Sequence, residues 1–228
     1  MDTLVRYDLR TTPLREVNTA LHKPGVKGEF VIDHPDGAHN VAVGVNAPVH
    51  VTVNGHVGYY AAGMNQQAEI LINGNAGTGV AENMMSGSVR VNGNASQSAG
   101  ATAHGGLLVI EGDAAARCGI SMKGVDIVVG GDVGHMSAFM AQAGRLVIRG
   151  NAGEALGDSI YEARLYVRGD VASLGADCIA KEMRPEHLEL LQGLLDRAGV
   201  TGVKSAEFKR YGSARTLYNF NIDNADAY

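Results

Sequence analysis

The sequence predicts an all-β protein: a single-stranded, right-handed parallel β-helix of about seven 19-residue coils, with short helical caps at both ends. Three periodic features lead to this prediction. Large aliphatic residues stand two and four positions before each repeat glycine, in the alternation of a strand with one buried face. Seven positions after each glycine the residue is Ala or Gly. The repeat glycines, each followed by Asn, Asp or His and then Val or Ala, are Gly55, Gly74, Gly93, Gly112, Gly131, Gly150 and Gly169.

The period also predicts the handedness. Left-handed β-helices are built from six-residue turns, with an aliphatic residue at every sixth position and coils of about 18 residues. Aliphatic residues two apart in coils of 19 residues match that pattern badly. We therefore expect a right-handed helix, with the repeat glycine and its Asx neighbour at a corner because both tolerate positive φ.

An open β-helix exposes unpaired edge groups, so both ends need caps. We divide the chain into an N-terminal cap with irregular strands (residues 1–48), a repeat domain (49–180) and a C-terminal helix and tail (181–228). The N-terminal cap should begin with a strand at residues 4–9. A short helix with Thr12 as N-cap and Pro13 at its first position should follow.

Two irregular, out-of-phase strands are expected at residues 30–32 and 41–45. After the coils, Pro185 should open a helix that Gly199 ends. The inward residues of this helix are predicted to be Leu188, Leu191, Leu195 and Ala198. The following tail is basic at first and then alternates apolar and polar residues from Tyr218 to Ile222.

Composition excludes several classes of function. The formal charge of −5, from 24 acidic and 19 basic residues, provides no field that would attract nucleic acid or an anionic membrane. The N-terminus lacks the pattern of a signal peptide and no apolar run approaches about 18 residues, so we expect a cytoplasmic protein. Cys118 and Cys178 lie three coils apart, roughly 14 Å by strand spacing, so no internal disulfide is expected.

No residue pattern predicts a catalytic, cofactor-binding or metal site in this chain. The eight histidines lack the spacing of a zinc site, and the glycine-rich segment 74–79 lacks the helix that a phosphate cradle requires. Asp113 and Asp132 are stacked corner residues, which leaves open a carbohydrate-active β-helix enzyme. In the neighbouring coils Asn occupies the same position, which favours a structural turn ladder instead of a demand for charge.

One outward-facing feature indicates an interaction. A solvated outer face should be polar, but in five coils the residue between the two inward aliphatics is apolar, which implies a cover. The cover is the chain's own C-terminal helix and tail, another subunit, or each of them along a different length of the stripe. Together with three residues of the basic-aromatic tail, the candidate subunit interface is Leu71, Val109, Val128, Val147, Tyr166, Arg210, Tyr211 and Arg215.

Residues 49–180, with the segments 74–79 and 105–112, resemble the C-terminal glycine-repeat (GXGXG) domain of glutamate synthase large subunits. The same type of domain forms a separate chain in glutamate-synthase-like assemblies and the C subunit of formylmethanofuran dehydrogenase. The C-terminal segments 208–215 and 217–221 resemble the ending of the free-standing glycine-repeat subunit of N-methylglutamate synthase.

This resemblance implies a role in methylamine and glutamate metabolism: methylamine and glutamate give N-methylglutamate and ammonia. It implies two partner chains, one like a glutamine amidotransferase and one that binds FMN, with an iron–sulfur cluster as a further option in that partner. The sequence contains neither an N-terminal Cys nucleophile nor a flavin barrel, so the resemblance implies a non-catalytic spacer that bridges the two. The alternatives are the equivalent subunit of a glutamate synthase-like or formylmethanofuran dehydrogenase-type complex.

Overall fold

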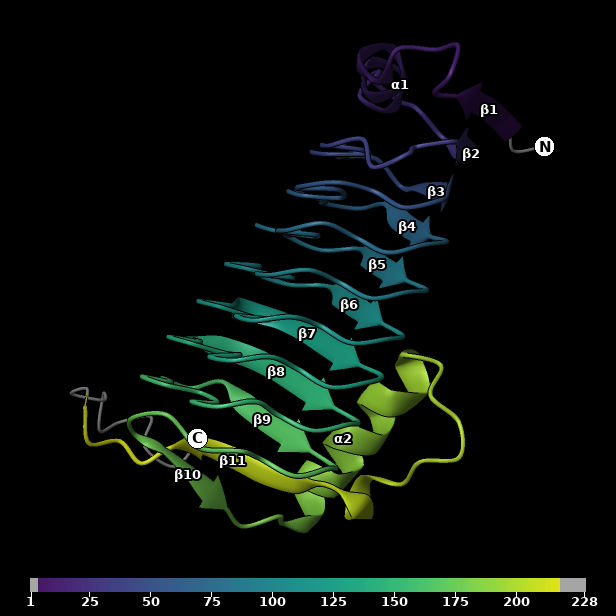
Figure 1. Cartoon of the computed structure of the whole chain (residues 1–228). Helices are drawn as coiled ribbons and strands as arrows, with labels where there is room; N and C mark the ends of the chain where they lie inside the picture. Colours follow the sequence, from purple (N-terminus) through teal and green to yellow (C-terminus); the bar gives the residue numbers. More distant parts are fainter. Residues whose placement is uncertain (1–3, 218–228) are drawn as a thin grey trace.

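One continuous sheet of eleven strands forms a wall of the coil stack (Figure 1). The computed structural model describes residues 4–217. Strands β1 to β9 are parallel and follow one another in chain order, which confirms the predicted parallel β-helix. They are β1 (Leu4–Asp8), β2 (Gly28–Asp33), β3 (Val49–Asn54), β4 (Glu69–Ile72), β5 (Ser88–Val91), β6 (Leu107–Ile110), β7 (Lys123–Val129), β8 (Ala143–Ile148) and β9 (Arg164–Val167).

The coils stack with the predicted 19-residue register. Val51 pairs with Ile70, and Ile70 pairs with Val89 one coil further on. A second ladder runs along the residues two positions after the repeat glycines, from Val57 to Val171. Large aliphatics from the first wall and small residues from the others fill a single column of buried side chains along the stack.

Close stacking, rather than positive φ, requires glycine at most of the corners. Of the seven repeat glycines only Gly55 has a positive φ, so the predicted reason is wrong for the other six. A Cβ at Gly74 would collide with the backbone of Gly55, and one at Gly112 would collide with Oδ1 of Asn94. The glycine therefore makes room for the preceding coil.

The neighbouring Asx residues form the predicted turn ladder. The backbone N–H of Asp113 donates to Oδ1 of Asn94 at 2.8 Å, and the N–H of Asp132 donates to Oδ1 of Asp113 at 2.8 Å. In the next coil the N–H of Asn151 donates to Oδ1 of Asp132 at 2.6 Å. Each of these side chains thus satisfies a backbone donor of the next coil, whether it is an amide or a carboxylate.

Seven positions after Gly169, Ala176 is exposed and has no positive φ. In the six preceding coils, left-handed backbone together with burial explains the small residue at this position. These residues have φ between 55° and 69°, and they face the interior, where a larger side chain would not fit. They are Ala62, Ala81, Gly100, Gly119, Ala138 and Gly157.

At the N-terminal end, helix α1 (Leu14–Leu21) closes the column with Val17 and Leu21. Its N-cap is Pro13 and not Thr12, and no side chain caps it. The strand predicted at residues 30–32 is present as part of β2, and its offset from β3 is 21 residues, outside the 19-residue phase. It is not irregular, because β2 pairs continuously with β3 and places Phe30 against Val51. Residues 41–44 form turns and not the predicted strand. The sheet continues from β2 to β3 across residue 48, where the N-terminal cap was predicted to end.

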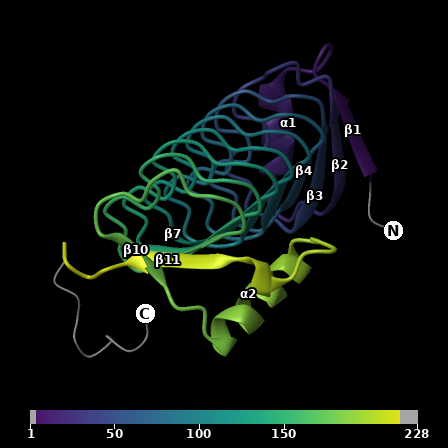
Figure 2. The same ribbon diagram turned by 60° about the horizontal axis from the view of Figure 1, so that its bottom comes forward.

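The C-terminal segment leaves the stack and then returns to it. After β10 (Cys178–Lys181), helix α2 (Pro185–Arg197) lies outside the coils, next to the sheet (Figures 1 and 2). Gly199, with φ of 71°, follows the end of α2 as predicted. A short 3-10 helix, η1 (Ser205–Glu207), leads into β11 (Lys209–Ser213), which inserts antiparallel between β9 and β10. The predicted alternation from Tyr218 to Ile222 lies outside residues 4–217.

Candidate functional site

Helix α2 covers most of the apolar outer stripe. Val109, Val128, Val147 and Tyr166 are at most 3% exposed and pack against α2 and the segment that follows it. The contacting side chains are Leu191, Leu194, Leu195, Ala198, Val203 and Phe208. Leu194 takes the inward place predicted for Leu188, which is only partly buried. The chain's own helix is therefore the cover for these four stripe residues, and none of them forms an open surface for a partner.

An ion-pair cluster attaches α2 to the sheet. The carboxylate of Asp126 on β7 lies 2.6 Å from Arg145 on β8 and 2.6 Å from Arg197 of α2. The Asp126 side chain is only 6% exposed, so both arginines offset the cost of burying its charge. Arg90 of β5 donates a 2.7 Å hydrogen bond to the carbonyl of Ala198 and marks the end of the covered region.

The outer face of β3 to β5 lies beyond this point and is not covered within residues 4–217. Leu71, the fifth residue of the stripe, is partly exposed there. It lies in a shallow pocket of about 340 Å³ between Thr52 and Arg90, with His50 and Glu69 at 3.1 Å from each other on one side. Leu71 is thus the stripe residue that stays available for an interaction with another molecule.

The predicted tail residues separate into two environments. Arg210 on β11 lies opposite Tyr166 of β9 and Lys181 of β10, and directly opposed residues share one face of a sheet. All three therefore belong to the outer face. Tyr211 has the other orientation and is part of the buried column.

Arg210 and Arg215 meet in a small basic pocket on this outer face. The pocket has a volume of about 20 Å³, and its lining includes four cationic side chains and a single carboxylate, that of Glu162. The cations are Arg164, Lys181, Arg210 and Arg215. A wider hollow of about 310 Å³ adjoins it beside α2 and shares Glu162 and Arg164.

The charges in the basic pocket affect one another. Burial lowers the pKa of Lys181, and the positive charges of Arg215 and Arg210 lower it further. Burial also lowers the pKa of Arg210, and Arg164 adds to that shift. Both directions reflect cations that are crowded together and partly removed from water.

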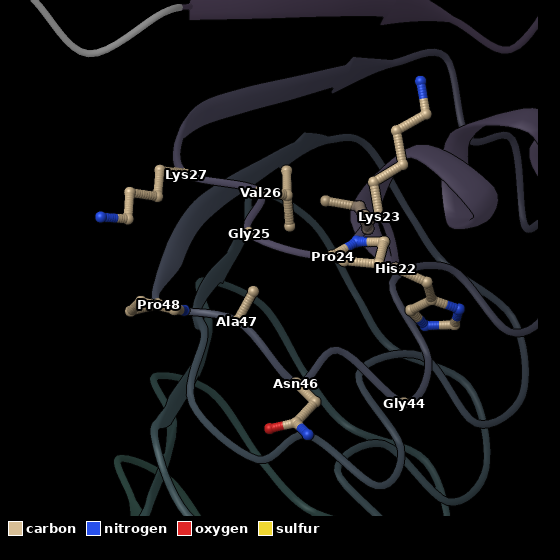
Figure 3. A pocket seen from close by; sticks show the side chains of 11 residues that line it. His22, Lys23, Pro24, Gly25, Val26, Lys27, Gly44, Asn46, Ala47 and Pro48 are labelled. Atoms are coloured by element: carbon tan, nitrogen blue, oxygen red, sulfur yellow. The ribbon is translucent and has the colours of Figure 1, made fainter.

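A larger pocket of about 400 Å³ lies at the N-terminal end, between residues 21–27 and 44–48 (Figure 3). His22 Nε2 lies 2.8 Å from the carbonyl of Val43, and Asn46 accepts a 2.8 Å hydrogen bond from Gln67. The side chains of Lys23 and Lys27 point away from each other. The polar groups do not converge on a common point, so this pocket has no catalytic arrangement.

The remaining reactive residues have structural surroundings. Cys118 and Cys178 are free and buried, and burial raises the pKa of each thiol to about 12. Within segment 74–79, a Cβ at Gly77 would collide with the backbone of Gly58, so this glycine serves coil stacking. In residues 4–217 no group of three or more His, Cys, Asp or Glu side chains could hold a metal ion. No helix in this part of the chain is long and apolar enough to cross a membrane.

Comparison with known proteins places the chain in a family. No family model matches it. The chain is 65% identical over 224 residues to Protein GlxC of Rhizobium meliloti (strain 1021). The aligned region covers 97% of this chain and 98% of that relative, so the cap, the coils and the C-terminal region all belong to the match. The chain therefore belongs to the GlxC family.

Proposed function

We propose that the chain is a non-catalytic structural subunit of a glutamate-synthase-like complex, and specifically of an N-methylglutamate synthase. The observation that carries the proposal is the uninterrupted in-register stack from β1 to β9, the repeat of which resembles the glycine-repeat domain of glutamate synthases. The relationship to Protein GlxC over almost the whole chain supports the same general assignment.

The architecture is suited to a strut. Backbone groups along the strands are paired with the coils on either side, so bending the stack would require breaking many hydrogen bonds together. A strut of this kind holds an amidotransferase-like chain and an FMN-binding chain, with or without an iron–sulfur cluster, at a constant separation. It also helps to shield an amine that passes between their sites from bulk water and protonation.

The equivalent subunit of a glutamate synthase-like or formylmethanofuran dehydrogenase-type complex would use the same strut with other partners. A carbohydrate-active enzyme would need carboxylates that are free to act as acid and base. Asp113 and Asp132 instead each accept a backbone hydrogen bond from the next coil. These contacts favour the structural role.

Purification of the tagged chain from its native source tests the proposal. We expect an amidotransferase-like chain and a flavin-containing chain to be recovered with it, together with methylamine-dependent formation of N-methylglutamate. Leu71→Glu should reduce this recovery, because it places a charge on the uncovered outer face. Met140→Glu, at a side chain that is 45% exposed elsewhere, is the matched control. Recovery of an isolated chain that cleaves polysaccharide would contradict the proposal.

A further inference from the structure

The basic pocket between β9, β11 and β10 concentrates positive charge on an acidic protein. The whole chain has a formal charge of −5, but four of the residues that line this pocket are cations and one is an acid. Arg164 and Arg215 also interact with other groups of the chain, whereas Lys181 and Arg210 crowd each other's positive charge, which an anion would relieve. The arrangement therefore favours an anionic ligand.

Two buried donors of one register pair of β9 and β11, of which Arg210 lines the pocket, have no acceptor among the described residues. Arg210 is 7% exposed, and its Nε–H has no hydrogen-bond partner among residues 4–217, although its Nη1 donates to the carbonyl of Glu182 at 3.0 Å. Its register partner Tyr166 is fully buried and has a hydroxyl group that likewise lacks a partner in this part of the chain. Buried polar groups are nearly always satisfied, so two orphans at one position indicate a missing water or ion.

The dimensions of the pocket restrict what enters it. A cavity of about 20 Å³ holds one or two groups of the size of a water molecule. A nucleotide or a sugar ring would not fit, whereas the oxygens of one carboxylate would. Arginine side chains in particular match the planar, two-oxygen geometry of that group.

We propose that this pocket binds a carboxylate group, with Arg210 and Lys181 as its principal cationic contacts. The carboxylate comes from an acidic side chain of a polypeptide or from a free small acid, and the experiment separates these sources. The inference goes beyond the proposed function, and it is tested on the isolated full-length chain. Its failure is therefore distinguishable from a failure to recover partner chains.

The test follows the Nε–H resonance of Arg210 by ¹⁵N–¹H NMR while acetate, inorganic phosphate, a hexaglutamate peptide or a hexaglutamine peptide is added. We expect acetate and hexaglutamate to shift the resonance, and hexaglutamine to leave it in place. Lys181→Gln should weaken this binding by about tenfold. Lys209→Gln, an exposed residue of the same strand with the same change in charge, is the matched control and should leave binding unchanged.

The relative affinities of acetate and hexaglutamate identify the source of the bound carboxylate. Hexaglutamate binding well above that of acetate supports a polypeptide source, and equal affinity per carboxylate supports a free small acid. The chain's own acidic residues Asp223 and Asp226 lie outside residues 4–217. Tighter acetate binding by the Asp223→Asn, Asp226→Asn double variant supports them as the source.

Three results would overturn the proposal. The first is an Arg210 resonance that no carboxylate shifts, which would mean that water satisfies the two orphan donors. The second is equal weakening by Lys181→Gln and Lys209→Gln, which would show only general surface charge. The third is phosphate binding more tightly than acetate, which would assign the pocket to another class of anion. Thermal unfolding of each variant checks that the fold is retained.

Discussion

The outer faces of β3 to β5 and of β6 to β9 differ, although the coils beneath them are alike. Both regions share the 19-residue register, the corner glycines and the inner aliphatic column. The outward residues are Thr52, Leu71 and Arg90 in the first region, and Val109, Val128, Val147 and Tyr166 in the second. Only the second is covered by α2. Inward residues therefore build the coil, while outward residues decide what covers it.

The largest expected effect comes from Val128→Glu in the covered region. The side chain is 1% exposed, and a carboxylate there would be buried against α2 without a matched cation. We expect a loss of about 3–5 kcal/mol in the free energy of unfolding. Hydrogen exchange should show α2 losing protection while β3 to β5 keep theirs. Normal protection of α2 in this variant would contradict the assignment of the cover.

Leu71→Glu is the matched change in the uncovered region. Its side chain is partly exposed and α2 does not contact it, so the free energy of unfolding of the isolated chain should change by less than about 0.5 kcal/mol. Urea unfolding of both variants measures the contrast. Similar losses in both would mean that the two outer faces are equivalent after all.

A corner shared by both regions should respond with an intermediate effect. Gly112→Ala places a Cβ against Oδ1 of Asn94, and the coil must shift to accommodate it. We expect a loss of about 1–3 kcal/mol in the free energy of unfolding, measured by urea titration. Gly202→Ala, where φ is 72° and a Cβ would meet nothing within 4 Å, measures the separate cost of a side chain at positive φ, which Gly112 does not have.

Removing the negative charge of Asp126 should weaken the attachment of α2 to the sheet, but less than Val128→Glu does. Asp126→Asn keeps the size of the side chain but leaves Arg145 and Arg197 without their shared carboxylate. Because Arg197 is 58% exposed and recovers hydration, we expect a loss of about 1–2 kcal/mol. Thermal unfolding at low and high salt measures it, and the difference from the native chain should shrink in high salt.

One substitution in the covering helix should give a gain. Gly193 lies inside α2, and a Cβ there would meet nothing within 4 Å. Gly193→Ala should therefore stabilise the chain by about 0.5–1 kcal/mol through helix propensity. We expect a higher unfolding midpoint and unchanged hydrogen exchange in β3 to β5, which would show that α2 stabilises only the covered region. A decrease would indicate that the helix surface is packed against something at this position.

The coils were predictable because their signal repeats. Each inward aliphatic recurs at the same phase, and a shift of one residue would turn the whole set outward, so periodicity alone specifies the register. Cys118 and Cys178 followed from that register as unpaired thiols. The apolar stripe followed as well, because hydrophobic side chains on a solvated face are anomalous wherever they occur.

The strand of the first coil was predicted at residues 30–32, but its continuous pairing with β3 was not, because this coil lacks the 19-residue repeat. The register partners in β2 and β3, such as Phe30 and Val51, are 21 residues apart instead of 19. At its corner Pro35 lies where a Cβ of Gly55 would contact it. The insertion of β11 between β9 and β10 had no sequence signal either, since a strand used once leaves no period to detect.

Local periodicity in the chain was thus sufficient for the coil, its register and its buried column, because each of these depends on contacts between equivalent residues of adjacent coils. The choice of α2 over another subunit as the cover, and the meeting of Arg210 with Arg164 and Lys181, depended on the three-dimensional structure. These contacts join segments that do not repeat and lie far apart along the chain. Their formation is decided by which surfaces remain to be buried once the coils have stacked.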